Sequence, residues 1–398
     1  MISKIHQGWL VALILFFCFT ITVGILQYSF GVFVTPLENE FGWSRTEING
    51  SVALFAVSGI TAPIVGPLLD KYGSKPIMII SILLIAFSFL LRPLMTELWQ
   101  YYALSVLSYA GMPGTVMLPV GKLIGVWFPN SRGRAMGFTT MGANFGGFIY
   151  STATVPLIDS IGWESTYFVF GITFFFLIPL VYLFIRDEPI LLDPIGTNNS
   201  VSPHLLGITT GDALRSKAFF FMIIGLLFAS VAYQSVLTQV VPHLENIGIS
   251  RGTAGAALGV IAIFGMLGKV LLGSLTEIVA SRFVFIGSLI AQIVAMIIMI
   301  SAGTSWYLWI FVPIYGLAFG GMGSLIPLIV QDTFGLKHFA SIFGLVNFFI
   351  LPAALIGPPL VGVSYDITGG YSLAFIIICV GFIIGSIAFF LAKPMEEN

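Results

Sequence analysis

The chain has very little charge and very little cysteine. Only 8% of its 398 residues are charged, whereas 58% are hydrophobic, and the mean hydropathy is +1.03. This leaves too little polar surface to cover a soluble globule, so the composition indicates an integral membrane protein. The two cysteines, Cys18 and Cys379, lie in apolar runs at opposite ends of the chain, which argues against a disulfide or metal-binding framework.

Other scarcities exclude whole classes of function. The net charge of -1, with no basic patch, gives no reason to expect nucleic acid as a partner. All four histidines lie near helix ends or in loops, so no buried acid-base or metal pair suggests an enzyme. Neither Gly121-Lys122 nor Gly268-Lys269 is followed by Ser or Thr, so no ATP-binding loop is visible. We expect no enzymatic activity, no cofactor and no metal.

Long apolar windows dominate what is present. Crossing about 30 Å of hydrocarbon takes a helix of about 20 apolar residues. Windows of this length predict an all-α protein with twelve membrane helices, near 8–34, 47–69, 77–96, 98–124, 134–158, 164–185, 218–242, 253–276, 283–302, 305–330, 340–364 and 371–392. The longest polar stretch lies between the sixth and seventh windows. We therefore predict a six-helix bundle over 1–185, a cytosolic linker over 186–217 and a second six-helix bundle over 218–398.

The distribution of lysine and arginine predicts the orientation. When the helices are threaded alternately across the bilayer, only Arg45, Arg92 and Arg251 fall in external loops, and most other basic residues fall on the opposite side. Basic residues concentrate on the cytosolic side of membrane proteins. We therefore expect both termini in the cytosol and a multi-pass protein of the plasma (inner) membrane.

Short motifs recur at a spacing of about 206 residues. The segment 36–46 returns as 242–253, Gly66-Pro67-Leu68-Leu69-Asp70 returns as Gly273-Ser274-Leu275-Thr276-Glu277, and 159–162 returns as 366–369. Three matches at nearly one spacing indicate two related halves in parallel orientation. Transporters built this way hold their substrate near the bilayer midplane, between the halves, and rock around it.

The loop from Gly66 to Lys75 resembles the cytosolic loop motif of the major facilitator superfamily. It has a glycine, an acid four residues later, and basic residues around a second glycine. The resemblance implies the major facilitator fold and a cytosolic latch in which the acid pairs with a cation or caps a helix. The residues concerned are Gly66, Asp70, Lys71, Gly73, Lys75 and Arg132. In the second half only Glu277 and Arg282 remain of the motif, which argues against a second latch there.

A narrower resemblance points to one branch of that superfamily. It is carried by Tyr28-Ser29-Phe30-Gly31-Val32-Phe33, by the run from Trp127 to Gly137, and by Gly268-Lys269 ahead of Gly273. These segments resemble the monocarboxylate transporters and the oxalate/formate antiporters. The resemblance implies that a cation at position 269 holds a substrate carboxylate, and that polar residues on the cavity-lining helices complete the site. The candidates are Gln27, Tyr28, Tyr109, Asn144, Tyr233, Gln234, Tyr315 and Asn347.

Lys269 is the most informative single residue. A lysine at a helix centre costs about 2.5 to 3.5 kcal/mol on insertion scales. The cost is offset either by snorkelling, since the predicted helix end is about seven residues away, or by facing a watery cavity. In a cavity, a carboxylate 4 Å away gains about 4 kcal/mol at an effective dielectric near 20. We favour the cavity. Lys122 is about as deep, and we interpret it as a snorkelling anchor more than a ligand.

The helices lack carboxylates in their middles, which makes cationic substrates and sodium coupling poor candidates. With one buried cation and not two, a dicarboxylate would keep an unpaired charge, so a monocarboxylate such as lactate or pyruvate is favoured. We hypothesise proton symport, because loss of water disfavours charged lysine and anion binding restores it. An exchanger of the oxalate/formate type, or an exporter of another organic anion or a drug, is the alternative. We expect a monomer in the bilayer.

Small residues predict where helices approach closely. Gly133, Gly137, Gly142 and Gly146 lie in the fifth predicted helix, and Gly255, Gly259, Gly268 and Gly273 lie in the eighth. Glycine allows backbone contact between membrane helices, and such contacts permit sliding.

Overall fold

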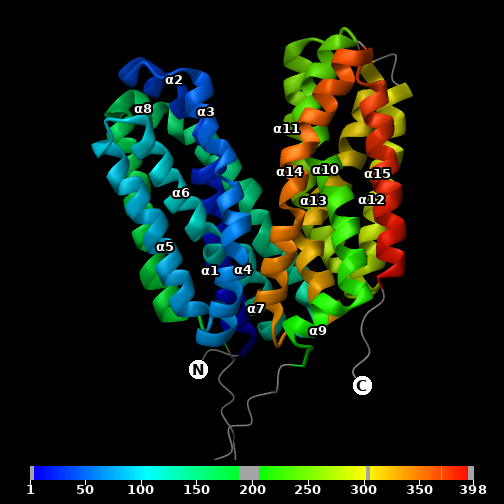
Figure 1. Ribbon diagram of the computed structural model, residues 1–398, viewed down its shortest axis with the longest axis horizontal. Coiled ribbons are helices and arrows are strands. Elements are labelled where there is room, and N and C mark those ends of the chain that lie inside the picture. Colours follow the sequence, from blue (N-terminus) through cyan, green and yellow to red (C-terminus); the bar gives the residue numbers. More distant parts are fainter. Residues whose placement is uncertain (1–3, 188–205, 302–304, 369, 393–398) are drawn as a thin grey trace, which may run out of the picture. The chain divides into compact units, whose positions relative to one another are not determined.

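The computed structural model describes residues 4–187, 206–301, 305–368 and 370–392, and within these ranges it is all-helical (Figure 1). Nine helices of this part are long and apolar enough to cross a membrane, and two shorter apolar helices cover Lys217–Ala232 and Phe339–Ala353. One of the nine, α8 (Arg132–Phe184), is two helices that meet at Gly162, where φ is +79°. The count of twelve crossings stays a prediction.

The helices of the first half follow the predicted windows, with local breaks. They are α1 (Lys4–Val23), the π-helix η1 (Gly24–Tyr28), α2 (Phe30–Phe41), α3 (Arg45–Ala53), α4 (Ala56–Tyr72), α5 (Ser74–Leu91), the short 3-10 helix η2 (Arg92–Leu94), α6 (Leu98–Thr115), α7 (Met117–Trp127) and α8. Val116 separates α6 from α7 with non-helical backbone angles, three residues after Pro113. Pro119, three residues after Val116, has no N–H for the carbonyl of Thr115 and its ring crowds that carbonyl, which accounts for a break here.

The second half is more regular. Its helices are α9 (Thr210–Arg215), α10 (Lys217–Asn246), α11 (Arg251–Leu275), α12 (Ser281–Ser301), α13 (Ser305–Phe334), α14 (Phe339–Thr368) and α15 (Ser372–Leu391). Serine side chains cap the first turns of α10 and α11, where Ser216 accepts from Phe219 N–H and Ser250 accepts from Thr253 N–H. These caps satisfy backbone donors that a helix start leaves unpaired.

The chain folds as two compact units, each of which takes a short segment from the other half of the sequence. Unit 1 consists of Met1–Pro129, Phe138–Gly207 and Gly335–Phe348, and unit 2 of Asn130–Gly137, Ile208–Phe334 and Phe349–Asn398. The two short segments, 130–137 and 335–348, contain the starts of α8 and α14, and they lie about 206 residues apart in the sequence. The predicted bundle boundaries at 185 and 218 stay a prediction.

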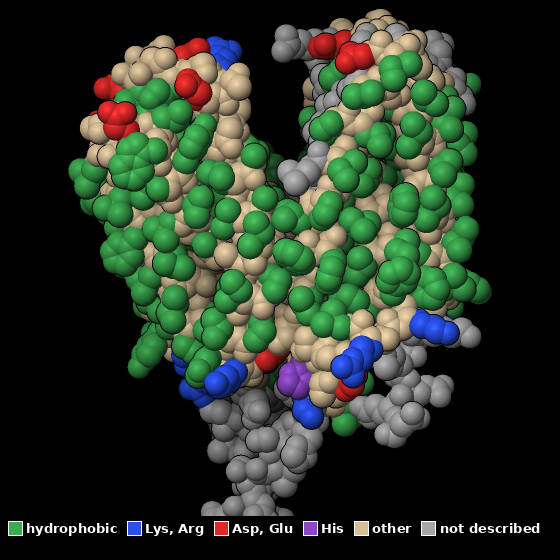
Figure 2. All heavy atoms as spheres, in the orientation of Figure 1, with side chains coloured by type: hydrophobic (Ala, Val, Ile, Leu, Met, Phe, Trp, Pro, Cys, Tyr) green, Lys and Arg blue, Asp and Glu red, His purple; other side chains and the backbone are tan. Residues whose placement is uncertain are grey.

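Within unit 1, α6 packs against α4 and α5, and within unit 2, α11 and α12 both pack along α13 while α15 packs on α10 and α12. On the face shown in Figure 2, hydrophobic side chains cover the middle of the helices, and Lys, Arg, Asp and Glu side chains lie near helix ends. That distribution is the one expected of helices in a hydrocarbon layer.

Candidate functional site

Lys269 lies on α11 where that helix touches α13. The Ser324 hydroxyl donates to the carbonyl of Lys269 at 3.1 Å, which fixes the two residues at the same level of the helix pair. A Cβ on the neighbouring Gly323 would lie 3.4 Å from Cε and 3.9 Å from Nζ of Lys269. The ammonium group therefore lies beside α13 at the level of its own helical turn, instead of extending along the helix toward Leu275.

Glycine makes room for this arrangement. A Cβ added to Gly268 would lie 2.1 Å from the carbonyl oxygen of Leu317. A Cβ added to Gly320 would lie 2.0 Å from the carbonyl oxygen of Gly265. Contacts this short admit only glycine, so α11 and α13 pack backbone to backbone. The lysine stem thus lies along a surface made flat by small residues.

The other predicted binding residues of unit 2 differ in their surroundings. Tyr315 is fully buried, with its ring stacked on Phe311 and Phe319 at centroid distances of 5.3 and 5.6 Å. A ring held this way packs α13 internally. Tyr233 and Gln234 lie on α10, but their side chains fall outside the part that the structure describes.

Two predicted binding residues, Gln27 and Tyr28, close the π-helix η1 in unit 1. The wider turn is anchored by the Ser29 hydroxyl, which donates to Ile25 O at 2.7 Å. Both side chains are exposed, and the Tyr28 ring passes close to Gly147 on α8. A π-turn inserted in an α-helix re-aims the side chains that follow it, and such turns recur at functional sites. The hydropathy pattern gave no sign of this turn.

Asn144 and Asn347 are half-buried. The side-chain amide of Asn347 donates to the carbonyl of Phe343, one turn earlier, at 2.8 Å. This local bond still leaves the amide oxygen of Asn347 to accept a further hydrogen bond.

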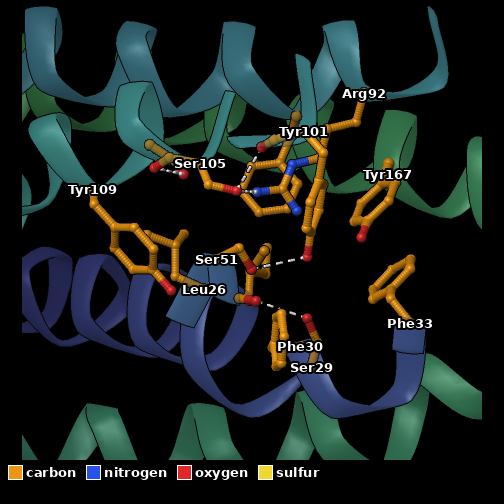
Figure 3. Close-up of a pocket in the computed structure, with 13 residues that line it drawn as sticks. Leu26, Ser29, Phe30, Phe33, Ser51, Arg92, Tyr101, Ser105, Tyr109 and Tyr167 are labelled. Atoms are coloured by element: carbon orange, nitrogen blue, oxygen red, sulfur yellow. Dashed lines mark hydrogen bonds between the residues drawn. The ribbon is translucent and has the colours of Figure 1, made fainter. Parts of the chain in front are cut away.

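Tyr109 lines a small cavity in unit 1 that the sequence did not predict (Figure 3). Its central residue is Arg92, which was predicted to lie in an external loop and is 8% exposed. The external side of Arg92 stays a prediction, but the count of one buried cation was wrong. Arg92 lies near the end of the predicted helix 77–96, after Leu90 and Leu91, a position that is compatible with either solvent or burial.

Aromatic rings surround the Arg92 guanidinium. Its Cζ lies 4.3 Å from the ring centre of Phe89, 4.9 Å from that of Tyr167 and 5.5 Å from that of Tyr101. Nη2 donates to the Ser105 hydroxyl at 3.5 Å, while Nε has no hydrogen-bond partner among the described residues. Within the same residues, no acidic side chain forms an ion pair with Arg92.

The predicted latch motif lies at the end of α4. Asp70 accepts from the backbone N–H of Ser341 at 2.8 Å and from the Ser341 hydroxyl at 2.7 Å, and Ala340 N–H lies 3.4 Å away. The carboxylate therefore caps the first turn of α14, where the helix dipole favours negative charge. Gly66 permits the approach, because its Cβ would lie 2.3 Å from Ala340 O.

Lys122 completes this cluster, and the interpretation as a snorkelling anchor was wrong. Its ammonium lies 3.5 Å from Asp70 and donates to the carbonyl of Leu69 at 3.0 Å, and the side chains of Lys122 and Asp70 are 8% and 7% exposed. Lys122 is therefore the buried counter-ion of the latch acid. Nothing in the one-dimensional pattern pairs residues 52 positions apart.

The remaining motif residues lie around the same loop. Gly73 has a φ of +88°, and a Cβ added to it would lie 2.7 Å from the carboxylate of Asp187. The same carboxylate accepts a hydrogen bond from Ser74 N–H at 2.7 Å. Lys71 lies over Tyr72 and Lys75 over Tyr182. Arg132 pairs with Asp332 at 3.2 Å, in unit 2.

A second cap exists in unit 2, contrary to the expectation from the degraded motif. Glu277 accepts from the backbone N–H of Arg134 at 3.1 Å, and its other oxygen lies 2.6 Å from Nη2 of the same residue. It thus caps α8 as Asp70 caps α14. The hydrogen bond from the Arg134 side chain holds the pKa of Glu277 below its ordinary value. Arg282, the other remnant of the motif, lies over the Phe283 ring instead.

Comparisons with known proteins agree with these features. A family model described as Major Facilitator Superfamily matches residues 9–358 and, separately, 240–398. The chain is 24% identical to the uncharacterized MFS-type transporter YcxA of Bacillus subtilis, over 95% of this chain and 93% of the relative. It is also 24% identical to monocarboxylate transporter 13 of Rattus norvegicus, over 93% of this chain and 85% of the relative.

A solved structure supports the same architecture. The fucose:proton symporter of E. coli superposes with a TM-score of 0.72 at 15% identity, over 99% of this chain and 100% of the symporter chain. At that identity the likeness shows the fold alone.

Proposed function

Because the chain belongs to the Major Facilitator Superfamily and is an integral multi-pass membrane protein, we propose that it is a secondary active transporter of a small organic anion. The substrate we favour is a monocarboxylate such as lactate or pyruvate. It moves with a proton, by rocking of the two halves around a site near the bilayer midplane. Both termini lie in the cytosol in this proposal, and the membrane is the plasma (inner) membrane.

The observation that carries the proposal is the placement of Lys269. A membrane lysine needs compensation, and this one lies beside the glycine surface of α13, six residues before the end of α11. A carboxylate is the ligand that recovers the cost of burying an ammonium group, since attraction at 4 Å is worth about 4 kcal/mol at a dielectric near 20. The relatives named as monocarboxylate transporters support this substrate class.

The same lysine provides a route for proton coupling. In an empty, poorly hydrated site the neutral amine is favoured, and a bound carboxylate favours the ammonium form. Binding of the anion then recruits a proton, and the pair is carried as a neutral unit. Gln27, Tyr28, Tyr109, Asn144, Tyr233, Gln234, Tyr315 and Asn347 are the polar residues proposed to orient the substrate, and the exposed tail of η1 favours Gln27 and Tyr28 among them.

Uptake into proteoliposomes tests the proposal. We expect an inward proton gradient to drive uptake of labelled lactate or pyruvate, and Lys269→Met to reduce it by at least about tenfold. Lys217→Met, which removes an exposed lysine at the start of α10, is the matched control and should transport normally. Uptake that survives Lys269→Met would refute the site.

Lys269→Arg separates binding from coupling. Arginine keeps the positive charge but stays protonated at all accessible pH values. We therefore expect this variant to bind and exchange monocarboxylates without proton-driven accumulation. A Lys269→Arg protein that still concentrates lactate against its gradient contradicts the coupling mechanism and leaves the substrate class standing. Oxalate in the same assay distinguishes a dicarboxylate exchanger.

A further inference from the structure

The cavity around Arg92 in unit 1 includes Tyr109, one of the residues proposed above to orient the substrate, but Arg92 itself has no role in the transport mechanism above. It is lined from η1, α2, α3, α5, η2, α6 and α8, and its polar lining includes Ser51, Arg92, Tyr101, Ser105 and Tyr109. We propose that this cavity is a binding site for one small inorganic monovalent anion of halide size, held by the Arg92 guanidinium and the hydroxyl groups around it.

The charge of the cavity is the first argument. Arg92 is more than nine-tenths buried, arginine stays protonated, and no carboxylate pairs with it among the described residues. A buried charge without a counter-ion is costly. The three aromatic rings reduce that cost through cation–π attraction, but they present faces and do not bond to Nε. An anion beside Nε supplies both the missing charge and the missing acceptor.

The hydroxyl groups are arranged to donate. Ser51 Oγ lies 2.9 Å from Ile48 O and 3.1 Å from the Tyr101 hydroxyl, and when its single proton goes to Tyr101 the tyrosine can donate its own proton to a ligand (Figure 3). The Tyr167 hydroxyl also lies close to the guanidinium. With Arg92 Nε, the Tyr101 proton provides a second donor from a different helix. An anion gains more from these donors than an uncharged acceptor such as water does, and a cation is repelled by Arg92.

Size selects among anions. The cavity measures about 10 Å³, which is at the lower limit for one water molecule. A halide is a single atom that needs only small side-chain shifts to fit here, whereas a carboxylate with a carbon chain needs the helices to separate. Ser29, Ser108 and Tyr109 close the cavity together with the rings of Phe30 and Phe33. Lys269 is not among the lining residues, and Tyr109 is the one lining residue that is also proposed to orient the substrate.

Chloride binding to the purified protein tests the proposal directly. In sodium gluconate at constant ionic strength, added chloride or bromide should raise the unfolding temperature saturably, and radiolabelled chloride should bind with about one ion per chain. Arg92→Gln should abolish both effects. Arg45→Gln is the matched control, because Arg45 is 68% exposed and pairs only at the surface with Glu38. It should respond as the wild type does.

Tyr101→Phe provides a variant that keeps the ring over Arg92 and removes one donor. We expect its chloride affinity to fall by about tenfold with little loss of stability in gluconate. This variant stays informative if Arg92→Gln does not fold.

Three results would overturn the proposal. The first is that the wild type binds no chloride. The second is that Arg92→Gln binds chloride with the affinity of the wild type. The third is that acetate and lactate bind at Arg92 while chloride has no effect. The first leaves Arg92 as a cation stabilised by rings alone, and the third assigns the cavity to the substrate. Loss of transport in Lys269→Met affects none of these readouts.

Discussion

Two lysines that look alike in the sequence have different surroundings in the structure. Lys122 and Lys269 both follow a glycine inside an apolar helix. Lys122 meets the carboxylate of Asp70 and a backbone carbonyl, while Lys269 lies along Gly323. The difference arises from which helix each one faces, which a one-dimensional pattern does not record. Burial with a counter-ion makes Lys122 a structural residue, whereas Lys269 is the residue that we propose to hold the substrate.

The Asp70–Lys122 pair predicts a stability effect at the residue scale. Lys122→Met leaves a buried carboxylate without its cation, so we expect the protein to lose about 3 kcal/mol of stability, seen as a lower unfolding temperature. Asp70→Asn together with Lys122→Met should recover part of the loss, because no lone charge remains. The lactate KM of the folded single variant should be unchanged, in contrast to Lys269→Met. A double variant that is as unstable as the sum of the two single variants contradicts a direct pairing.

At the scale of elements, the main feature is close packing between helices at glycine residues. Six of the eight predicted contact glycines, among them Gly137 and Gly273, have backbone atoms within 3 Å of where a Cβ would be, whereas Gly255 and Gly259 have no atom within 4 Å. Both parts of α11 contain glycine. The helix turns its first glycines away from any described neighbour and its later ones toward α8 and α13.

This difference gives a matched pair of substitutions. In Gly137→Val the new side chain would meet Lys269 O at 2.4 Å and Val270 Cα at 2.8 Å, both of which are backbone. We expect a loss of about 1 to 3 kcal/mol from overpacking, measured by thermal unfolding, and reduced transport because α11 is displaced at Lys269. Gly255→Val, with open space around it, should unfold within a few degrees of the wild type. Equal losses in the two variants would show that helix propensity, and not contact, sets the cost.

The cap of α8 predicts a pH dependence. Arg134 lowers the pKa of Glu277 below its ordinary value of 4.5, so the unfolded chain takes up this proton at a higher pH than the folded chain does. The cap therefore stabilises fully above pH 4.5 and is lost as the pH falls through the lowered pKa. Glu277→Gln should cost about 1 kcal/mol or less at pH 7, since Arg134 is largely exposed.

Thermal unfolding of the wild type and Glu277→Gln between pH 7 and pH 3 measures this effect. The gap between the two proteins should close at the acid end of the range. A gap that widens on acidification would mean that the carboxylic acid form, and not the carboxylate, makes the contact.

The element pattern was largely predictable because hydropathy reports burial in lipid. The apolar windows fall on the observed helices, and Gly162 separates α8 where two windows were predicted to meet. The π-turn at Gly24–Tyr28 and the break at Val116 were not predicted, because each depends on packing around one residue. The Arg92 cavity was missed for a related reason, since an arginine near a helix end is equally compatible with solvent and with a cage of rings.

The two halves of the chain share their capping contacts as well as their sequence motifs. Asp70 and Glu277 lie 207 residues apart, as do the helix starts they cap at Arg134 and Ser341. A glycine precedes each acid by four residues and lies against the backbone of the segment that the acid caps. Gly66 lies against Ala340, and Gly273 lies against Gly133. The second half therefore keeps the contact although it loses the basic residues of the motif. The contact needs only an acid and a glycine, and these are the two features that the repeat preserves.

This repetition leads to a prediction for the molecule as a whole. One cap lies within unit 1 and the other within unit 2, with no shared partner. We expect Asp70→Asn and Glu277→Gln to lower stability independently, so that the double variant loses the sum of the single losses to within about 0.5 kcal/mol. The Asp70 change should cost more, because its carboxylate is buried and Glu277's partner is exposed. Denaturant or thermal unfolding of the four proteins measures the sum. A double variant whose loss falls short of the sum by well over that margin would show that breaking one cap already releases the other, and the two repeats would then open as one cooperative unit.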